Sequence, residues 1–239
     1  MTSSVSERLK LAHPDSNQIQ SFFNVITAKY DFLNSFFSLG LDHYWRRQLV
    51  RLSLIGSERT ILDLGAGTGK SLEAFLNAHP FERAVGCDFS ENMLEKAKAR
   101  LGERAELIAC DFHALPFAHQ SFDIVTGSFI LRSVQNMTRF LSEVKHVVKP
   151  EGKAVFLELT RPQNQLAWNL FYRPYVQFYI PLIGKLFSKH DEAYQFLSDS
   201  VRAFRTPEEL REEFFKVGFK KVSINPLTFG AATIIEGKS

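Results

Sequence analysis

The stretch that most constrains this chain is ILDLGAGTGK, at residues 61–70. Two apolar residues lead into Asp63, and glycines follow at every second position: Gly65, Gly67 and Gly69. Apolar residues then recur at helical spacing, so the pattern predicts a buried strand, a tight turn and a helix. Glycines let a backbone approach a ligand closely, and the first turn of a helix offers unpaired N–H groups. The stretch therefore predicts a nucleotide-type binding site.

Three classes of ligand compete for this turn. The dinucleotide fingerprint G-x-G-x-x-G requires a glycine where this chain has Lys70, so it fits only in part. The phosphate loop G-x-x-x-x-G-K-[ST] requires a glycine where this chain has Leu64, so it fails. The pattern D-x-G-x-G-x-G, followed by an acid at the end of the next strand, is typical of S-adenosylmethionine sites and fits at every position. A tight turn that binds no ligand is the remaining alternative.

Composition indicates one globular domain. The 239 residues are 45% hydrophobic, which is enough for a good-sized core. The formal charge of +3 is spread along the chain, so no nucleic-acid partner is predicted. The polar N-terminal stretch and the lack of a run of about 20 apolar residues favour a cytoplasmic location.

The cysteines and the other metal-binding residue types predict no special chemistry. Cys87 and Cys110 form no C-x-x-C pair, and each ends a predicted strand, so we expect two separate buried thiols in a reduced protein. His, Cys, Asp and Glu do not cluster with the spacing of metal ligands, so no metal site is predicted.

Strands and helices alternate along most of the chain, which predicts an α/β fold with a doubly wound, mostly parallel seven-stranded sheet. A short turn at Asn225–Pro226 predicts that the last two strands form an antiparallel hairpin. The expected strands are 60–64, 83–87, 105–110, 122–127, 153–159, 220–224 and 229–236, and the expected helices are 70–78, 91–101, 137–148 and 207–217.

Three segments fall outside this alternating pattern. Residues 1–17 read as a flexible tail, and a helical preface at 18–54 opens a single domain that we expect to span 18–239. Residues 161–204 are aromatic and interrupted by prolines, and they form an insertion within that domain. The 23 phenylalanines mostly indicate core packing, but their excess outside the sheet also suits a pocket for a flat or apolar ligand.

Acids follow the second and third predicted strands. Asp88 comes 25 residues after Asp63, where a carboxylate can accept hydrogen bonds from ribose hydroxyls. The alternative role of Asp88 is a helix N-cap, which Ser90 can equally fill. Asp111 can accept from an adenine amino group, while the ring of Phe112 covers the base.

Several motifs resemble those of class I S-adenosylmethionine methyltransferases, which have a Rossmann-like fold. They are DLGAGTG, CDFHALPFAHQSFDIV and VVKPEGKAVFLELTRP. More narrowly, FFNVITAKYDFLNSFFSLGLDHYWRR and DEAYQFLSDSVRAFRTPEEL are similar to the quinone C-methyltransferases that methylate demethylmenaquinol and the related ubiquinone precursor. The resemblance runs from about residue 22 to residue 238.

The resemblance implies a set of residues that contact S-adenosylmethionine. In the family a segment like S-F-G-L-R-N-V follows the fourth strand, whereas this chain has Ile130 in place of the glycine and Ser133 in place of the asparagine. Ile130 narrows the space beside the site, and these departures bear on the acceptor rather than on the reaction class. The cofactor-binding candidates are Asp63, Gly65, Gly67, Thr68, Gly69, Asp88, Asp111, Phe112 and Ser128.

Two residues are candidates for the chemistry itself. Arg132 is expected to stabilise a phenolate or a deprotonating water, and its alternative role is an ion pair on the surface or at a helix start. Tyr30 is expected to close over the methyl donor, and its alternative role is a buried core tyrosine. The pair His190–Asp191 is a weaker candidate for the base, because such a loop pair is usually solvated.

The expected function is S-adenosylmethionine-dependent C-methylation of a demethylated prenyl quinol, with demethylmenaquinol favoured. The apolar segment at 168–187 is expected to form the wall of the acceptor pocket or to touch a membrane surface, and its alternative role is a helix that packs on the sheet. Two other hypotheses remain open: a methyltransferase for another lipophilic acceptor, such as a phospholipid amine, and a non-catalytic protein that keeps the fold.

Overall fold

The computed structural model describes residue 35, residues 38–160 and residues 204–239. The predictions for the tail at 1–17, for most of the helical preface, for Tyr30 and for the aromatic segment 161–203 lie outside these residues and stay predictions. The same holds for the single domain at 18–239.

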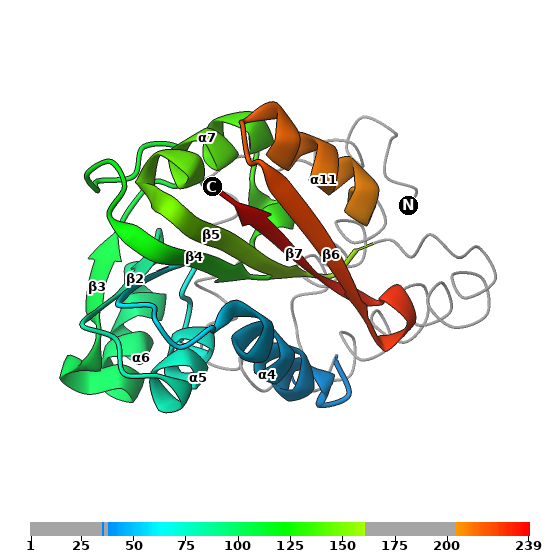
Figure 1. Ribbon diagram of the computed structural model, residues 1–239. Coiled ribbons are helices and arrows are strands. Elements are labelled where there is room, and N and C mark those ends of the chain that lie inside the picture. The colour runs from blue at the N-terminus through cyan, green and yellow to red at the C-terminus, as the bar shows by residue number, and fades with distance from the viewer. Residues whose placement is uncertain (1–34, 36–37, 161–203) are drawn as a thin grey trace, which may run out of the picture.

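A seven-stranded sheet forms the centre of the described structure, with the strand order β3-β2-β1-β4-β5-β7-β6 (Figure 1). Strands β1 to β5 run parallel, and β7 runs antiparallel to both of its neighbours. The predicted doubly wound sheet with an antiparallel final hairpin is therefore confirmed. The strands are β1 (Thr60–Leu64), β2 (Arg83–Asp88), β3 (Glu106–Ala109), β4 (Phe122–Ser128), β5 (Val148–Glu158), β6 (Lys221–Leu227) and β7 (Ala232–Lys238).

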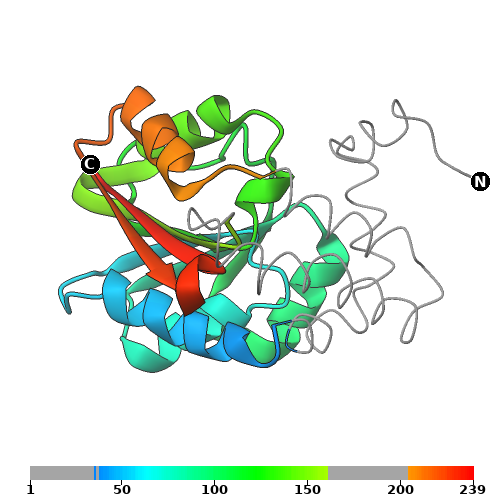
Figure 2. The same ribbon diagram turned by 90° about the vertical axis from the view of Figure 1, so that its right-hand side faces the viewer.

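Helices cover both faces of the sheet, because the strand side chains alternate between two apolar layers (Figures 1 and 2). On one face, Ile61 packs with residues of α4, α5 and α6, such as Leu49, Phe75 and Ala97. On the other face, Leu62 packs with residues of α7 and α11. The helices are α4 (Leu41–Ser53), α5 (Lys70–Ala78), α6 (Glu91–Leu101), α7 (Met137–Val147) and α11 (Pro207–Lys216).

Most predicted element bounds hold within one or two residues, but β5 begins five residues before the predicted start at Lys153. Residues 150–152 lie inside this strand, where its pairing with β4 is irregular. Phe122 pairs with Val148, whereas Ile124 pairs with Lys153, so the extra residues bulge out of the ladder. Glu151 takes a positive φ of 61° within this bulge.

The turn of the final hairpin also differs from the prediction. Strand β6 runs through Asn225 and Pro226, and the turn is the 3₁₀ segment η5 (Thr228–Gly230). Pro226 pairs with Thr233 in this ladder. Proline has no backbone N–H to donate to a neighbouring strand. It is tolerated in β6 because β6 is the edge strand and has a neighbour on one side only.

Phenylalanines fill the layer between the sheet and helices α7 and α11. Phe156 of β5 lies with its ring centroid 5.7 Å from that of Phe140 and 6.1 Å from that of Phe214. Phe219 packs beside Phe214 and also covers Gly237, where an added Cβ would lie 2.6 Å from Phe214. The core-packing interpretation is therefore confirmed for these residues.

A buried ion pair joins Lys153, in the middle of β5, to Glu58, which lies just before β1. Lys153 Nζ lies 3.1 Å from Glu58 Oε1, and both side chains are less than a tenth exposed. Glu58 also accepts the backbone N–H groups of Ile55 and Gly56. Burial acts to raise the pKa of Glu58, but these hydrogen bonds and Lys153 outweigh it and leave the pKa lowered.

Lys153→Met is expected to lower the free energy of unfolding by about 3–5 kcal/mol, because the Glu58 carboxylate stays buried without its cation. Urea unfolding at neutral pH measures this loss. Glu58→Gln in the same chain still accepts from Ile55 and Gly56 but carries no charge, so the double variant should recover most of the stability. A double variant no more stable than Lys153→Met would contradict this account.

Candidate functional site

The glycine turn lies at the carboxyl end of β1, next to the point where the strand order reverses between β1 and β4. Gly65, Gly67 and Gly69 all have positive φ, at 64°, 54° and 83°. Side chains are strained in this region, so the conformation of the turn requires glycine. Gly69 is the residue before α5 and has no side chain to cap the helix.

Asp88, the last residue of β2, ties the glycine turn to the neighbouring strand. Its Oδ2 accepts the backbone N–H of Gly67 at 2.8 Å, and its Oδ1 accepts the N–H of Ser90 at 3.0 Å. Burial raises the pKa of Asp88, and these N–H groups oppose the rise. The Ser90 side chain caps α6 by accepting from Met93, so the cap that was an alternative role for Asp88 belongs to Ser90.

Asp63 lies beneath the turn and is 1% exposed. Neither of its carboxylate oxygens makes a hydrogen bond within the described part of the chain. Burial raises its pKa to about 7; the charge of Arg46 opposes the rise, and the charge of Asp88 adds to it. Asp63 is thus a buried acid close to its titration point at neutral pH.

Arg46 brings helix α4 into the site, and sequence reasoning missed it. The guanidinium donates to the hydroxyl of Ser71 in α5 and lies 5.2 Å from the ring centre of Phe129. Ser71 in turn donates to the hydroxyl of Ser128 at 2.8 Å. The predicted cofactor residue Ser128 is therefore linked to α4, a contact between residues far apart in sequence that no local pattern signals.

A second unpredicted arginine, Arg100 of α6, holds the glycine turn from the other side. Its Nη1 donates to the carbonyl oxygen of Thr68 at 2.9 Å and to the Thr68 hydroxyl at 3.0 Å. Its Nε also lies 3.7 Å from a carboxylate oxygen of Glu73. Thr68, predicted as a cofactor contact, is buried and accepts both of these hydrogen bonds from Arg100.

Asp111 and Phe112 follow β3 and lie at the same edge of the sheet. Asp111 is more than half exposed and accepts the backbone N–H of His113 at 2.8 Å, which lowers its pKa. The ring of Phe112 meets that of Phe89 edge to face, with centroids 6.4 Å apart. Phe89 is a further aromatic at the predicted adenine position. Its place directly after Asp88 is a signal that sequence reasoning overlooked.

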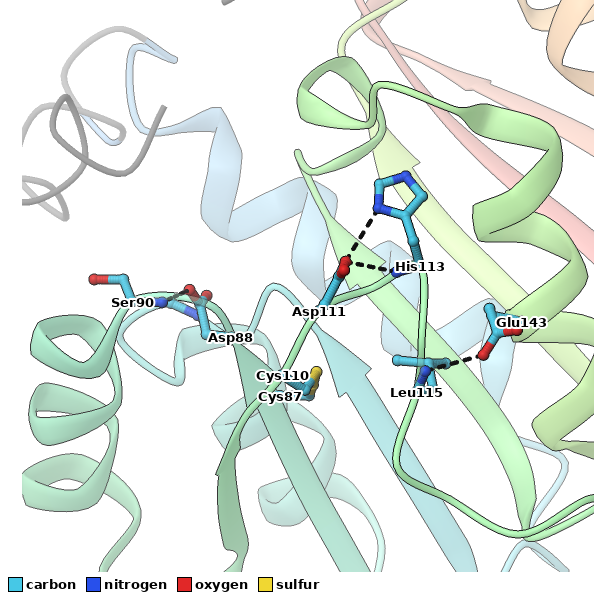
Figure 3. The surroundings of a disulfide bond; sticks show 9 residues. Cys87, Asp88, Ser90, Cys110, Asp111, His113, Leu115 and Glu143 are labelled. Carbon is cyan, nitrogen blue, oxygen red and sulfur yellow. Dashed lines mark hydrogen bonds and ion pairs between the residues drawn. A yellow bond between two sulfur atoms is a disulfide. The ribbon is translucent and has the colours of Figure 1, made fainter. Parts of the chain in front are cut away.

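The cysteines contradict the prediction of two separate thiols. Cys87 and Cys110 form a disulfide, with their Cα atoms 6.0 Å apart (Figure 3). They directly precede Asp88 and Asp111, so the bond joins the two strand ends that carry these acids. The two cysteines are 23 positions apart in the sequence, and the pairing of the parallel strands β2 and β3 brings them together. The prediction rested only on the absence of a C-x-x-C motif, which does not report on such distant pairs. The prediction of a reduced protein loses this support.

The segment after β4 packs directly on the glycine turn. A Cβ added to Gly65 would lie 2.1 Å from Ile130 Cγ2, and one added to Gly127 would lie 2.8 Å from Ile130 Cδ1. Phe129 takes a positive φ of 63°, which is unusual for an aromatic residue. Ile130 therefore fills the space over two glycines, as expected from its replacement of a family glycine.

Arg132 forms a buried ion pair at the same end of the sheet. Its Nε lies 2.6 Å from Oε1 of Glu158, the last residue of β5. The Arg132 side chain is 9% exposed and that of Glu158 is fully buried. Arg132 lies in the 3₁₀ turn η2 (Leu131–Ser133), so the structure supports an ion pair at a helix start but rules out a surface position.

The structure thus gathers most of the predicted cofactor residues around one turn. Asp63, Thr68, Asp88 and Ser128 are buried around it, whereas Asp111 and Phe112 follow β3, which is separated from β1 by β2. Within the described ranges, no group of His, Cys, Asp and Glu is arranged to hold a metal ion. No helix in the same part of the chain is long and apolar enough to cross a membrane.

An open cleft of about 560 Å³ lies elsewhere, between α6 and the edge of the sheet at β2 and β3. Two ion pairs lie among its lining residues, Arg83 with Glu106 and Lys98 with Glu103. None of the predicted site residues lines it. The cleft therefore does not mark the site.

Comparisons with known proteins agree with this geometry. The model of the ubiE/COQ5 methyltransferase family matches residues 11–238. Among curated relatives, the demethylmenaquinone methyltransferase of Thermotoga maritima is 38% identical over 90% of this chain and 93% of its own length. The ubiquinone/menaquinone biosynthesis C-methyltransferase UbiE of Desulfotalea psychrophila is 36% identical over 90% of this chain and 88% of its own length.

A solved structure shows the same fold. Phosphoethanolamine N-methyltransferase 2 of Haemonchus contortus, in complex with S-adenosyl-L-methionine, superposes with a TM-score of 0.56 at 20% identity. The match covers 75% of this chain and 37% of that one.

Asp63→Asn is expected to flatten the pH dependence of stability. The pKa of Asp63 is higher in the folded chain than in the unfolded chain, so its contribution is complete below about pH 4 and is lost as pH rises through about 7. The wild-type protein should thus lose up to roughly 4 kcal/mol at this residue between these limits. Urea unfolding without ligand at several pH values measures the slope, and equal slopes for both proteins would contradict the raised pKa.

Proposed function

Because the chain belongs to the ubiE/COQ5 methyltransferase family, we propose that it transfers the methyl group of S-adenosylmethionine to a ring carbon of a demethylated prenyl quinol. The observation that carries this proposal is the 38% identity to a demethylmenaquinone methyltransferase along nearly the whole of both chains. The names of the relatives favour the menaquinone precursor as the acceptor, with the ubiquinone precursor as the related alternative.

The residues at the turn fit S-adenosylmethionine. This cofactor supplies a methyl group on a positively charged sulfur. Each oxygen of the Asp88 carboxylate accepts one backbone N–H and has a further lone pair, which suits the two ribose hydroxyls. Phe89 and Phe112 offer apolar surfaces for the adenine ring, and Asp111 offers a carboxylate for its amino group.

Asp63 suits a cationic ligand. Its carboxylate is buried without a described hydrogen bond, so a positive charge nearby stabilises its ionised form. We propose that binding of S-adenosylmethionine lowers the pKa of Asp63, and that Arg46 keeps the acid partly compensated before the ligand arrives.

Arg132 is the proposed catalytic residue. Carbon methylation of a hydroquinol needs an electron-rich ring, which forms when a phenolic hydroxyl loses its proton. A guanidinium held in a buried position stabilises the phenolate through fixed N–H donors. Since the transfer is an in-line displacement, the remaining work of the protein is to align the acceptor carbon with the methyl group and to exclude water.

A second candidate acceptor follows from Ile130. This side chain fills the space over Gly65 and Gly127, where the quinone methyltransferases that the sequence resembles have a glycine. Because Ile130 narrows the space beside the site, the acceptor can differ from that of the quinone methyltransferases. The alternative is another lipophilic acceptor, such as a phospholipid amine. The reaction class and the methyl donor stay the same in this alternative.

We also propose that the protein works from the cytoplasmic side at a membrane surface, because prenyl quinols reside in membranes. The support is the apolar sequence at 168–187, which contains two basic residues suited to lipid headgroups, Arg173 and Lys185. Tyr30 keeps its proposed role of closing over the methyl donor.

Asp88→Asn is expected to weaken S-adenosylmethionine binding about 10–100-fold, because charge-assisted hydrogen bonds to the ribose are lost. Calorimetric titration of the purified protein measures the dissociation constant. Glu106→Gln, in the exposed ion pair with Arg83, is the matched control and should bind as the wild type does. Equal affinity in Asp88→Asn would exclude the ribose contact.

The proposed reaction is tested with S-adenosylmethionine that carries a labelled methyl group. The protein is mixed with reduced demethylmenaquinol in detergent, and a lipid extract is the second acceptor. We expect label in the quinone ring, and a loss of about 100-fold or more in kcat for Arg132→Ala, as for the removal of a single transition-state donor.

Each other outcome changes the conclusion in a defined way. Label in another lipid alone would replace the acceptor and keep the reaction class. Tight cofactor binding without transfer to either acceptor would overturn the quinol proposal. Failure to bind the cofactor would overturn the proposal as a whole.

A further inference from the structure

Glu158 is a fully buried carboxylate at the carboxyl end of β5. Its neighbour Leu157 pairs with Ser128 of β4, so Glu158 lies one residue from the strand position of a proposed cofactor contact. A buried carboxylate is costly unless it is paired and hydrogen-bonded. The position of Glu158 therefore needs a reason.

Three donors converge on this carboxylate. Oε1 accepts the Nε–H of Arg132 at 2.6 Å and the backbone N–H of Leu159 at 2.8 Å. Oε2 accepts the backbone N–H of Arg132 at 3.2 Å. Glu158 thus holds Arg132 at both its backbone and its side chain.

The contact through Nε has a geometric consequence. A guanidinium is planar, and Nε is the nitrogen next to the aliphatic stem. A hydrogen bond at Nε, together with one at the backbone N–H, fixes both ends of the side chain and restricts its rotation. The guanidinium of an arginine held in this way is already oriented before a ligand binds. Less conformational entropy is therefore lost on binding.

We propose that Glu158 is a positioning residue for methyl transfer, which orients the guanidinium of Arg132 toward the acceptor. The inference rests on the proposed function, in which Arg132 stabilises the phenolate. Glu158 itself is fully buried and acts through Arg132.

A second buried ion pair of β5 offers a matched control. Glu58 and Lys153 also form a buried ion pair, with an Nζ–Oε1 distance of 3.1 Å. Glu58 lies before the start of β1, at the end of that strand opposite the glycine turn. If Glu158 only stabilised the fold, neutralising either carboxylate would have the same consequences.

The experiment compares Glu158→Gln, Arg132→Ala, the double variant and Glu58→Gln. For Glu158→Gln we expect kcat to fall about 10-fold or more, while the affinity for S-adenosylmethionine changes less than 2-fold. Since Glu158 acts through Arg132, the double variant should be no slower than Arg132→Ala. Glu58→Gln should lose stability but keep the wild-type kcat at a temperature where it is folded.

Nuclear magnetic resonance of arginine Nε gives a readout that needs no acceptor. In the wild-type protein the Arg132 Nε–H signal, assigned by its loss in Arg132→Ala, should exchange slowly with water. In Glu158→Gln the signal should exchange rapidly.

The outcomes separate the two proposals. A rapidly exchanging Arg132 Nε–H in the wild type would overturn the positioning role, whatever the acceptor is. Additive losses in the double variant, or an equal loss of kcat in Glu58→Gln, would also overturn it. A slowly exchanging signal in a protein that methylates another lipid would overturn the quinol acceptor, and the kcat ratios are then measured on that lipid.

Discussion

The Asp88 carboxylate is the contact on which the rest of the site depends. It accepts one N–H from the glycine turn after β1 and one from the segment that starts α6, so two neighbouring strand ends share a single acid. The three glycines of the turn have no side chains that could stabilise their positive φ angles. Its shape is therefore maintained from outside, by Asp88 at Gly67 and by Arg100 at Thr68. A ligand at this turn meets a backbone that is already ordered.

The sequence predicted those features of the fold and site that local patterns encode. Alternating strand and helix periodicity predicted the parallel sheet and its antiparallel final hairpin, because each element buries its own apolar face. The glycine turn and Asp88 were predicted for a similar reason, since both lie at strand ends that the periodicity identifies. Turns were predicted less well: Pro226 suggested one, but an edge strand accommodates it.

Contacts between distant residues were the part that the sequence did not reveal. The Cys87–Cys110 bond joins adjacent strands, and the bonds made by Arg46 and Arg100 link helices to a turn. Neither arginine stands out by spacing or composition, because a charged residue on a predicted helix usually faces solvent. Only the packing of three helices on one face of the sheet turns these side chains inward. The role of Glu158 was missed for the same reason, since a strand-end acid has no local signature of its partner.

The electrostatics at this end of the sheet explain why arginines recur there. Asp63 and Glu158 are buried carboxyl groups on different strands, and each is stabilised by a guanidinium from another element: the charge of Arg46 acts on Asp63, and Arg132 pairs with Glu158. A buried charge without its partner costs several kcal/mol, so each acid constrains where its arginine lies. A guanidinium suits this arrangement better than an ammonium. It is planar, so a guanidinium that is hydrogen-bonded to its acid also has a fixed orientation.

The two acids differ in the number of hydrogen bonds that they accept, and this difference matters for ligand binding. The Glu158 carboxylate accepts three hydrogen bonds, whereas Asp63 has no described hydrogen bond, so a cationic ligand gains most at Asp63.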